Sequence, residues 1–143
     1  MRTWLLDTGP LVAYLVASEK EHPQVVARLD AFAGQLVTTN AVITEAMHLV
    51  VRSRKGPALL AEFVAQSGLQ VVDFSQAGDL AEAARRMEKY ANLPMDYADA
   101  TLVLLGERLK VFEILTLDRR GFSVYRASRG KRFTLLLDKP ETG

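Results

Sequence analysis

The sequence predicts an α/β domain built on a mainly parallel sheet of about five strands. Short apolar segments of strand length alternate with longer segments of helical periodicity, and parallel neighbours in a sheet need such helical crossovers. The first apolar segment, Trp4-Leu5-Leu6, is continuous, which is typical of a strand covered on both faces. The 143 residues contain no repeat and no linker-like stretch, so residues 1–143 are expected to form a single domain.

Each element is expected from its periodicity and from the residues at its ends. In chain order the segments are strand 3–6, helix 11–17, helix 22–32, strand 36–38, helix 40–54, helix 58–66, strand 69–74, helix 75–91, helix 96–109, strand 113–117 and strand 133–137. Thr8 and Asn40 are suitable N-caps for the first and third helices, and Gly56-Pro57 separates the third from the fourth. Helix 11–17 is apolar on nearly every side, so we expect it to be buried or to pack against a partner chain. Helix 75–91 is the clearest amphipathic segment.

Composition excludes several classes of protein. The chain is 49% hydrophobic and 24% charged and has no cysteine, so it can form neither a disulfide nor a thiolate metal site. Asp7 and Gly9-Pro10 interrupt the apolar N-terminal run, which argues against a secretion signal, and no stretch is long enough to cross a membrane. We therefore expect a cytoplasmic protein without membrane contact. The C-terminal segment 125–143 is basic and could help to hold a polyanion, or be a solvated surface.

Acidic residues are predicted to meet at one edge of the sheet. Asp7 and Asp118 end the first and fourth strands, where open parallel sheets bind their ligands. Glu45 lies in the helix after the second strand, and Asp99 lies in the first turn of the helix before the fourth. Asp96 and Asp99 have capping-box spacing, so either could be a cap; we assign Asp99 to the site and Asp96 to capping or to support of the site.

Four carboxylates in one place repel one another, and a divalent cation removes that repulsion. Mg²⁺ and Mn²⁺ prefer oxygen ligands and retain several waters. A metal-bound water is a nucleophile near neutral pH, and the metal stabilises charge on a phosphoryl oxygen. The predicted metal ligands and catalytic residues, Asp7, Glu45, Asp99 and Asp118, therefore suit metal-assisted phosphodiester hydrolysis.

Four segments in order resemble those of the PIN-domain ribonucleases, most closely the VapC-like toxins of toxin–antitoxin pairs. They are Leu5-Leu6-Asp7-Thr8-Gly9-Pro10-Leu11, Val42-Ile43-Thr44-Glu45-Ala46, Asp96-Tyr97-Ala98-Asp99-Ala100-Thr101, and Ile114-Leu115-Thr116-Leu117-Asp118 leading to Gly121-Phe122. The resemblance implies a three-layer α/β/α fold, Mg²⁺- or Mn²⁺-dependent endonuclease cleavage of RNA, a homodimer and a small antitoxin partner. It places the four acids on the acidic positions of the family, with Thr8 and Thr116 beside them to orient carboxylates or waters. The long basic end of the chain departs from the commonest toxin pattern.

Three other functions fit parts of the sequence. A catalytically silent PIN-like module could bind only RNA or protein. Asp7-Thr8-Gly9 is also the signature of aspartic proteases, but those proteins are all-β and use two such aspartates. Glu45 and His48 would make half of a di-iron site. Contacts to RNA phosphates are expected from basic residues near the site: Arg52, Arg54, Lys55, Arg119 and Arg120.

Overall fold

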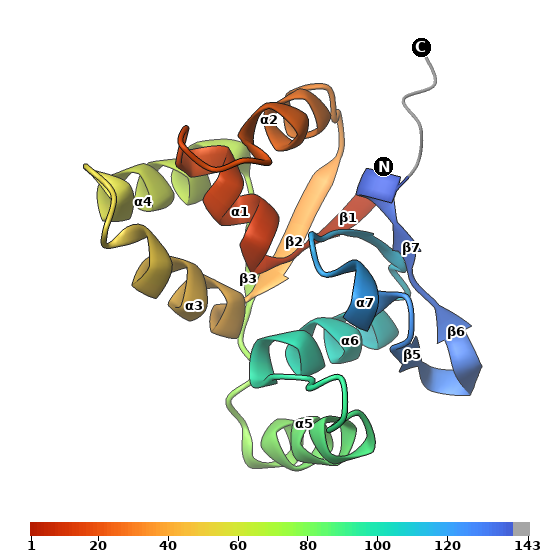
Figure 1. Ribbon diagram of the computed structural model, residues 1–143. Coiled ribbons are helices and arrows are strands. Elements are labelled where there is room, and N and C mark those ends of the chain that lie inside the picture. Colours follow the sequence, from red (N-terminus) through yellow and green to blue (C-terminus); the bar gives the residue numbers. More distant parts are fainter. Residues whose placement is uncertain (139–143) are drawn as a thin grey trace.

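Five parallel strands form the central layer of the computed structural model, which describes residues 1–138 (Figure 1). Across the sheet the strands are β3 (Gln70–Val72), β2 (Gln35–Thr39), β1 (Thr3–Leu6), β4 (Glu113–Leu115) and β7 (Thr134–Leu135). Leu5 in β1 pairs with Val37 on one side and with Ile114 on the other, and all three side chains are buried. The predicted parallel sheet is confirmed.

Helices cover both faces of this sheet, which confirms the three-layer α/β/α arrangement (Figure 1). One group packs together on the first face: α1 (Thr8–Leu15), α2 (His22–Asp30), α3 (Asn40–Val50) and α4 (Gly56–Ser67). The other group contains α5 (Ala77–Lys89) and α6 (Tyr97–Leu109). No helix in residues 1–138 is long and apolar enough to span a membrane.

The chain beyond β4 contains short elements that were not predicted. They are α7 (Arg119–Phe122), the antiparallel pair β5 (Arg126–Ala127) and β6 (Lys131–Arg132), and the 3₁₀ turns η1 (Ser128–Gly130) and η2 (Leu136–Asp138). Elements of two to four residues carry no periodicity to read. The predicted strand 133–137 is likewise observed only as the two residues of β7. Residues 139–143 of the basic segment lie outside the described residues.

Two predicted helix caps are wrong by one residue. Asp7, not Thr8, caps α1, because the Asp7 carboxylate accepts a hydrogen bond from the Thr8 N–H. Thr39, not Asn40, caps α3 by accepting from the Val42 N–H at 3.3 Å. In both places two adjacent residues have side chains able to cap, and the observed cap is the one with extended backbone angles.

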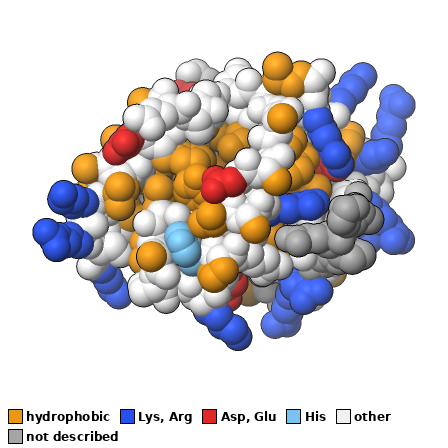
Figure 2. All heavy atoms as spheres, turned by 90° about the horizontal axis from the view of Figure 1, so that it is seen from above, with side chains coloured by type: hydrophobic (Ala, Val, Ile, Leu, Met, Phe, Trp, Pro, Cys, Tyr) orange, Lys and Arg blue, Asp and Glu red, His pale blue; other side chains and the backbone are white. Residues whose placement is uncertain are grey.

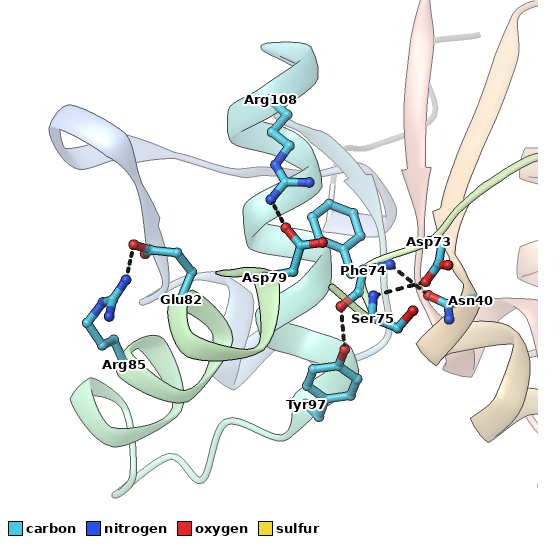
Figure 3. Close-up of polar contacts among 9 residues, drawn as sticks. All are labelled: Asn40, Asp73, Phe74, Ser75, Asp79, Glu82, Arg85, Tyr97 and Arg108. Atoms are coloured by element: carbon cyan, nitrogen blue, oxygen red, sulfur yellow. Dashed lines mark hydrogen bonds and ion pairs between the residues drawn. The ribbon is translucent and has the colours of Figure 1, made fainter. Parts of the chain in front are cut away.

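Phe74, in the linker from β3 to α5, holds the starts of α3 and α6 in place (Figure 3). Its N–H donates to Asn40 Oδ1 at 3.1 Å, and its carbonyl accepts from the Tyr97 hydroxyl at 2.8 Å. The buried Phe74 ring also lies 4.3 Å from the Arg108 guanidinium, which in turn pairs with Asp79. Asn40 is therefore occupied in joining two parts of the chain rather than in capping its own helix.

α6 has the longest continuous buried stretch of the helices in residues 1–138. Its residues from Ala100 to Gly106 are all buried. A methyl group at Gly106 would lie 2.8 Å from the Val111 carbonyl oxygen and 3.3 Å from the Leu5 side chain, so the missing Cβ lets the helix approach β1 closely. This packing fixes the C-terminal part of α6 against β1.

Candidate active site

Asp7 is placed at the carboxyl ends of β1 and β4 together. It directly follows β1, and its N–H donates to the Leu115 carbonyl of β4 at 3.0 Å. The side chain is only 6% exposed. Oδ1 accepts from the Thr8 N–H at 2.8 Å and Oδ2 accepts from the Thr116 hydroxyl at 2.6 Å, so both carboxylate oxygens are held in position.

Thr116 connects Asp7 to Asp118. Its buried hydroxyl donates to Asp7 Oδ2 and accepts from the Asp118 N–H at 2.9 Å. Asp118 then caps α7, with its Oδ1 accepting from the Gly121 N–H at 3.0 Å. One hydroxyl thus fixes the position of the Asp7 carboxylate relative to the Asp118 backbone.

Asp96 and Asp99 form a complete capping box at the start of α6. The Asp99 N–H donates to Asp96 Oδ1 at 2.8 Å, and the Asp96 N–H donates to Asp99 Oδ2 at 3.3 Å. Asp99 is half-buried and its Oδ2 also accepts from the Tyr125 hydroxyl at 3.3 Å, whereas Asp96 is exposed. Both side chains therefore cap the N-terminus of α6, and Asp99 is the more buried of the two.

Glu45 completes the group from α3, where its side chain is half-buried. A cavity of about 470 Å³ lies between these elements. Five acids line it: Asp7, Glu45, Asp96, Asp99 and Asp118. No Lys, Arg or His lines it, and none of the four ion pairs found within residues 1–138 involves these acids. The cavity is consequently an uncompensated centre of negative charge.

The pKa values of three of these acids are raised by this environment. Burial is the main cause for Asp7, and the charges of Glu45 and Asp96 add to it against the two hydrogen bonds that Asp7 accepts, leaving its pKa at about 6. Burial, followed by the charge of Asp7, raises the pKa of Asp99 to about 8. Burial also raises the pKa of Glu45. Near neutral pH the cavity therefore retains protons that a bound cation would displace.

The five acids present oxygen donors to the cavity from several elements of the fold. In the described part of the chain no three Asp, Glu or His side chains are gathered tightly enough to form a ready-made metal site. The acids line the cavity wall instead, as mutual repulsion favours. Mg²⁺ keeps several waters and binds only one or two carboxylates directly, so the donor set fits a hydrated ion. The Thr8 hydroxyl is buried beside the Glu45 carboxylate, where it could bind a water of such an ion.

The predicted RNA-contacting residues do not line the cavity. Arg52, Arg54 and Lys55 lie in the exposed turn between α3 and α4. Arg119 and Arg120 are exposed on α7, immediately after Asp118. All five of these cations therefore lie outside the lining of the acidic cavity, and Arg119 and Arg120 are its neighbours in the chain.

Two residues of the site were given no role from the sequence, although Gly121 follows the fourth segment of the family resemblance. Tyr125 is buried, contacts Asp99 and has its own pKa raised, chiefly by burial. Gly121 leaves room for the site, since a methyl group there would lie 2.4 Å from Asp118 Oδ2 and 2.7 Å from the Tyr125 hydroxyl oxygen. The Asp-x-x-Gly spacing was a possible signal for Gly121, but no sequence pattern links Tyr125 to Asp99.

The fold rules out two of the alternatives. A parallel sheet with helices on both faces is not the all-β fold of an aspartic protease, and the Asp-Thr-Gly motif occurs once. His48 is exposed on α3 of this sheet protein, so Glu45 and His48 are not part of a four-helix di-iron centre.

Comparisons with known proteins agree with this architecture. The family model of the PIN domain matches residues 4–127. Ribonuclease VapC26 of Mycobacterium tuberculosis (strain ATCC 25618 / H37Rv) is 36% identical over an alignment of 136 residues, which covers 92% of this chain and 98% of that protein. The crystal structure of Mycobacterium tuberculosis VapC20, described as a Sarcin-Ricin loop cleaving toxin, superposes with a TM-score of 0.72 at 15% identity, covering 80% of this chain and 89% of that one. At this low identity the superposition demonstrates a shared fold only.

Proposed function

This chain belongs to the PIN domain family, and from that premise we propose that it is a divalent-metal-dependent endoribonuclease and the toxin of a toxin–antitoxin pair. The observation that carries the proposal is the cavity at the carboxyl edge of the sheet, lined by five acids and by no basic residue. The identity to a ribonuclease over almost the full length of both chains supports the same activity.

Asp7, Glu45, Asp99 and Asp118 would hold Mg²⁺ or Mn²⁺ on the wall of the cavity. When bound, the ion would lower the pKa of a coordinated water and stabilise negative charge on the phosphoryl oxygen. The other requirements fall to the chain itself. Each oxygen of Asp7 accepts one hydrogen bond from the protein and retains a lone pair for a ligand.

Thr116 and Tyr125 keep the acids in position. The Thr116 hydroxyl orients Asp7 Oδ2, and the Tyr125 hydroxyl donates to Asp99 Oδ2. Asp96 holds the first turn of α6 and thereby the backbone of Asp99. Because Asp99 has a raised pKa, it holds a proton at neutral pH until a cation displaces it.

Partners are part of the proposal. A cleft of about 300 Å³ between α1 and α4 is lined largely by the side chains of Tyr14, Leu15, Leu59 and Phe63. Such an apolar cleft fits a small antitoxin or a second copy of the chain better than it fits RNA. The space-filling view shows a hollow floored by apolar side chains on this helical side of the molecule (Figure 2). The cytoplasm, where RNA is abundant, is the proposed location.

The activity is tested with purified protein and a mixture of RNAs, in Mg²⁺, in Mn²⁺ and in EDTA. We expect cleavage with either metal, none in EDTA, and none from Asp7→Asn. Asp73→Asn is the matched control, because Asp73 is exposed and its side chain only accepts from the Ser75 N–H.

Cleavage by Asp7→Asn at the wild-type rate would refute the assigned site. Metal-independent binding of RNA without cleavage under any condition would instead identify the silent PIN-like module.

A further inference from the structure

A strongly basic cavity lies at the amino ends of β1, β4 and β7, on the edge of the sheet opposite to Asp7. It measures about 880 Å³ and is formed by the residues before β1, the turn from α6 to β4, and the segment from η1 to β7. Its cations are Arg2, Lys110, Arg129, Lys131 and Arg132. Lys and Arg side chains gather at this end of the molecule in the space-filling view, on the side where Figure 1 shows β6 and β7 (Figure 2).

Most of this positive charge has no acidic ion-pair partner within the described residues 1–138. Glu113 is the one acid in the cavity lining, and both of its oxygens bind Arg2, at 2.9 Å from Nε and 2.5 Å from Nη2. The other four cations take part in none of the ion pairs within residues 1–138. A smaller adjoining pocket shares Arg2 and adds Arg28, whose guanidinium lies 5.3 Å from the Trp4 ring.

The backbone at two of these cations does not favour a long side chain. Lys110 has φ of 55° and Arg129 has φ of 62°, and Gly130 follows at 73°. Glycine or asparagine adopts this left-handed conformation at lower cost than other residues. The left-handed backbone therefore selects neither the lysine at 110 nor the arginine at 129, although a cation at 110 also suits the C-terminus of α6.

A nuclease with an all-acidic cutting cavity needs such a surface elsewhere. Phosphate contacts by Lys and Arg supply most of the affinity of a protein for nucleic acid. The acidic cavity has no Lys or Arg in its lining and repels phosphates until a metal is bound. The affinity must consequently come from cations outside that cavity.

The edge strand β7 connects the two ends of the molecule. Thr134, at its start, lines the basic cavity. Leu137, just after its end, lines a further pocket of about 280 Å³ that also contains Lys20, Arg119 and Leu117. Leu117 is shared with the acidic cavity. The small pocket thus adjoins the acidic cavity, and β7 lies between it and the basic cavity.

We propose that the basic cavity at the amino ends of β1, β4 and β7 is an anchoring site for the phosphates of the RNA substrate, away from the bond that is cut. The proposal rests on the proposed ribonuclease function. The four residues of β1 separate the two ends of the sheet by about 13 Å, so a bound RNA must extend several nucleotides beyond the cut. Arginine suits phosphate, because its planar fork can donate two hydrogen bonds to one phosphate group.

The test removes two charges without straining the chain. Lys110→Asn combined with Arg129→Asn places in both left-handed positions a residue that tolerates them. The matched control, Arg85→Gln combined with Lys89→Gln, removes two exposed cations of α5, which line neither of the two cavities. Binding of a long and of a short single-stranded RNA is measured in EDTA over a range of salt concentrations, and cleavage of the long RNA is measured in Mg²⁺ or Mn²⁺.

We expect the first variant to bind the long RNA more weakly and to have a raised KM with an unchanged kcat, while binding of the short RNA changes little. The slope of log Kd against log salt should fall by roughly 0.7 for each lost phosphate contact, roughly 1.4 for the pair. The control should match the wild type. Lys131→Gln with Arg132→Gln repeats the test on β6 if circular dichroism shows that the first variant is unfolded.

The two proposals fail in different ways. A wild-type protein that neither binds nor cuts RNA removes the ribonuclease function and the anchoring site with it. A wild-type protein that cuts RNA, with variants equal to the control in Kd and in salt slope, overturns the anchoring site alone. That second result would leave the basic cavity to an acidic protein partner.

Discussion

Replacing Asp7 by asparagine should change how the stability of the metal-free protein depends on pH. The unfolded chain ionises this carboxyl near 3.8, whereas the folded chain holds the proton until about pH 6. Between these values the unfolded state binds fewer protons than the folded state, so the wild-type protein loses stability as the pH rises. The Asn variant has no proton to lose at this position.

The magnitude follows from the two pKa values. A pKa raised from 3.8 to about 6 corresponds to roughly 3 kcal/mol of destabilisation above pH 6. Part of this destabilisation is already present at pH 4.5. The difference in unfolding free energy between the variant and the wild type should therefore rise by about 2 kcal/mol between pH 4.5 and pH 7.5. Loss of the Asp7 charge also lowers the pKa of Asp99, which acts in the same direction.

Urea unfolding in EDTA at the two pH values measures this difference. Comparing two pH values cancels any cost of the substitution that does not depend on pH, such as a rearranged hydrogen bond to Thr116. Asp73→Asn is the control, and its difference from the wild type should stay within about 0.5 kcal/mol at both pH values. If the unfolding free energies of the Asp7→Asn variant and the wild type change in parallel between the two pH values, then burial does not raise the pKa of the Asp7 carboxyl.

Two further predictions concern the same cavity. Mg²⁺ should raise the melting temperature of the wild type more at pH 8.5 than at pH 5.5. At the lower pH the cation must displace the protons that Asp7 and Asp99 hold, because their pKa values are about 6 and about 8. Differential scanning fluorimetry measures the two melting temperatures, and an equal rise at both pH values contradicts the prediction. Gly121→Ala should slow cleavage by roughly 100-fold in single-turnover assays, because the new methyl group would lie 2.4 Å from Asp118 Oδ2 and must displace that carboxylate. An alanine variant that cuts RNA at the wild-type rate would show that the position of Asp118 is unimportant.

The positions of Asp7 and Asp118 could be predicted because the carboxyl ends of parallel strands meet at one edge. A residue that follows a buried strand therefore has a known place even before the sheet order is known. Asp99 and Asp96 could be assigned to the start of one helix for a similar reason, since their spacing fits a capping box. The metal-ligand roles of all four predicted acids remain a prediction.

What could not be predicted depends on contacts between distant parts of the chain. Tyr125 meets Asp99 only because α7 and the following turn bring residues 26 positions apart into contact. The basic segment is divided in a way that composition does not reveal. Arg126 is used internally, with Nη1 donating to the carbonyls of residues 123, 124 and 125, whereas the next cations along the chain reach the opposite edge of the sheet.

Three helices begin at acids of the candidate site: α1 at Asp7, α6 at Asp96 and α7 at Asp118. An inserted residue just before any of these acids would move the carboxylate and the first turn of its helix by the same step. The lengths of β1 and of the chain from β4 to α7 are therefore fixed by folding and by chemistry at once. Variation in chain length among functional relatives should be confined to turns that start no helix at the site and line neither cavity, such as the turn from α4 to β3.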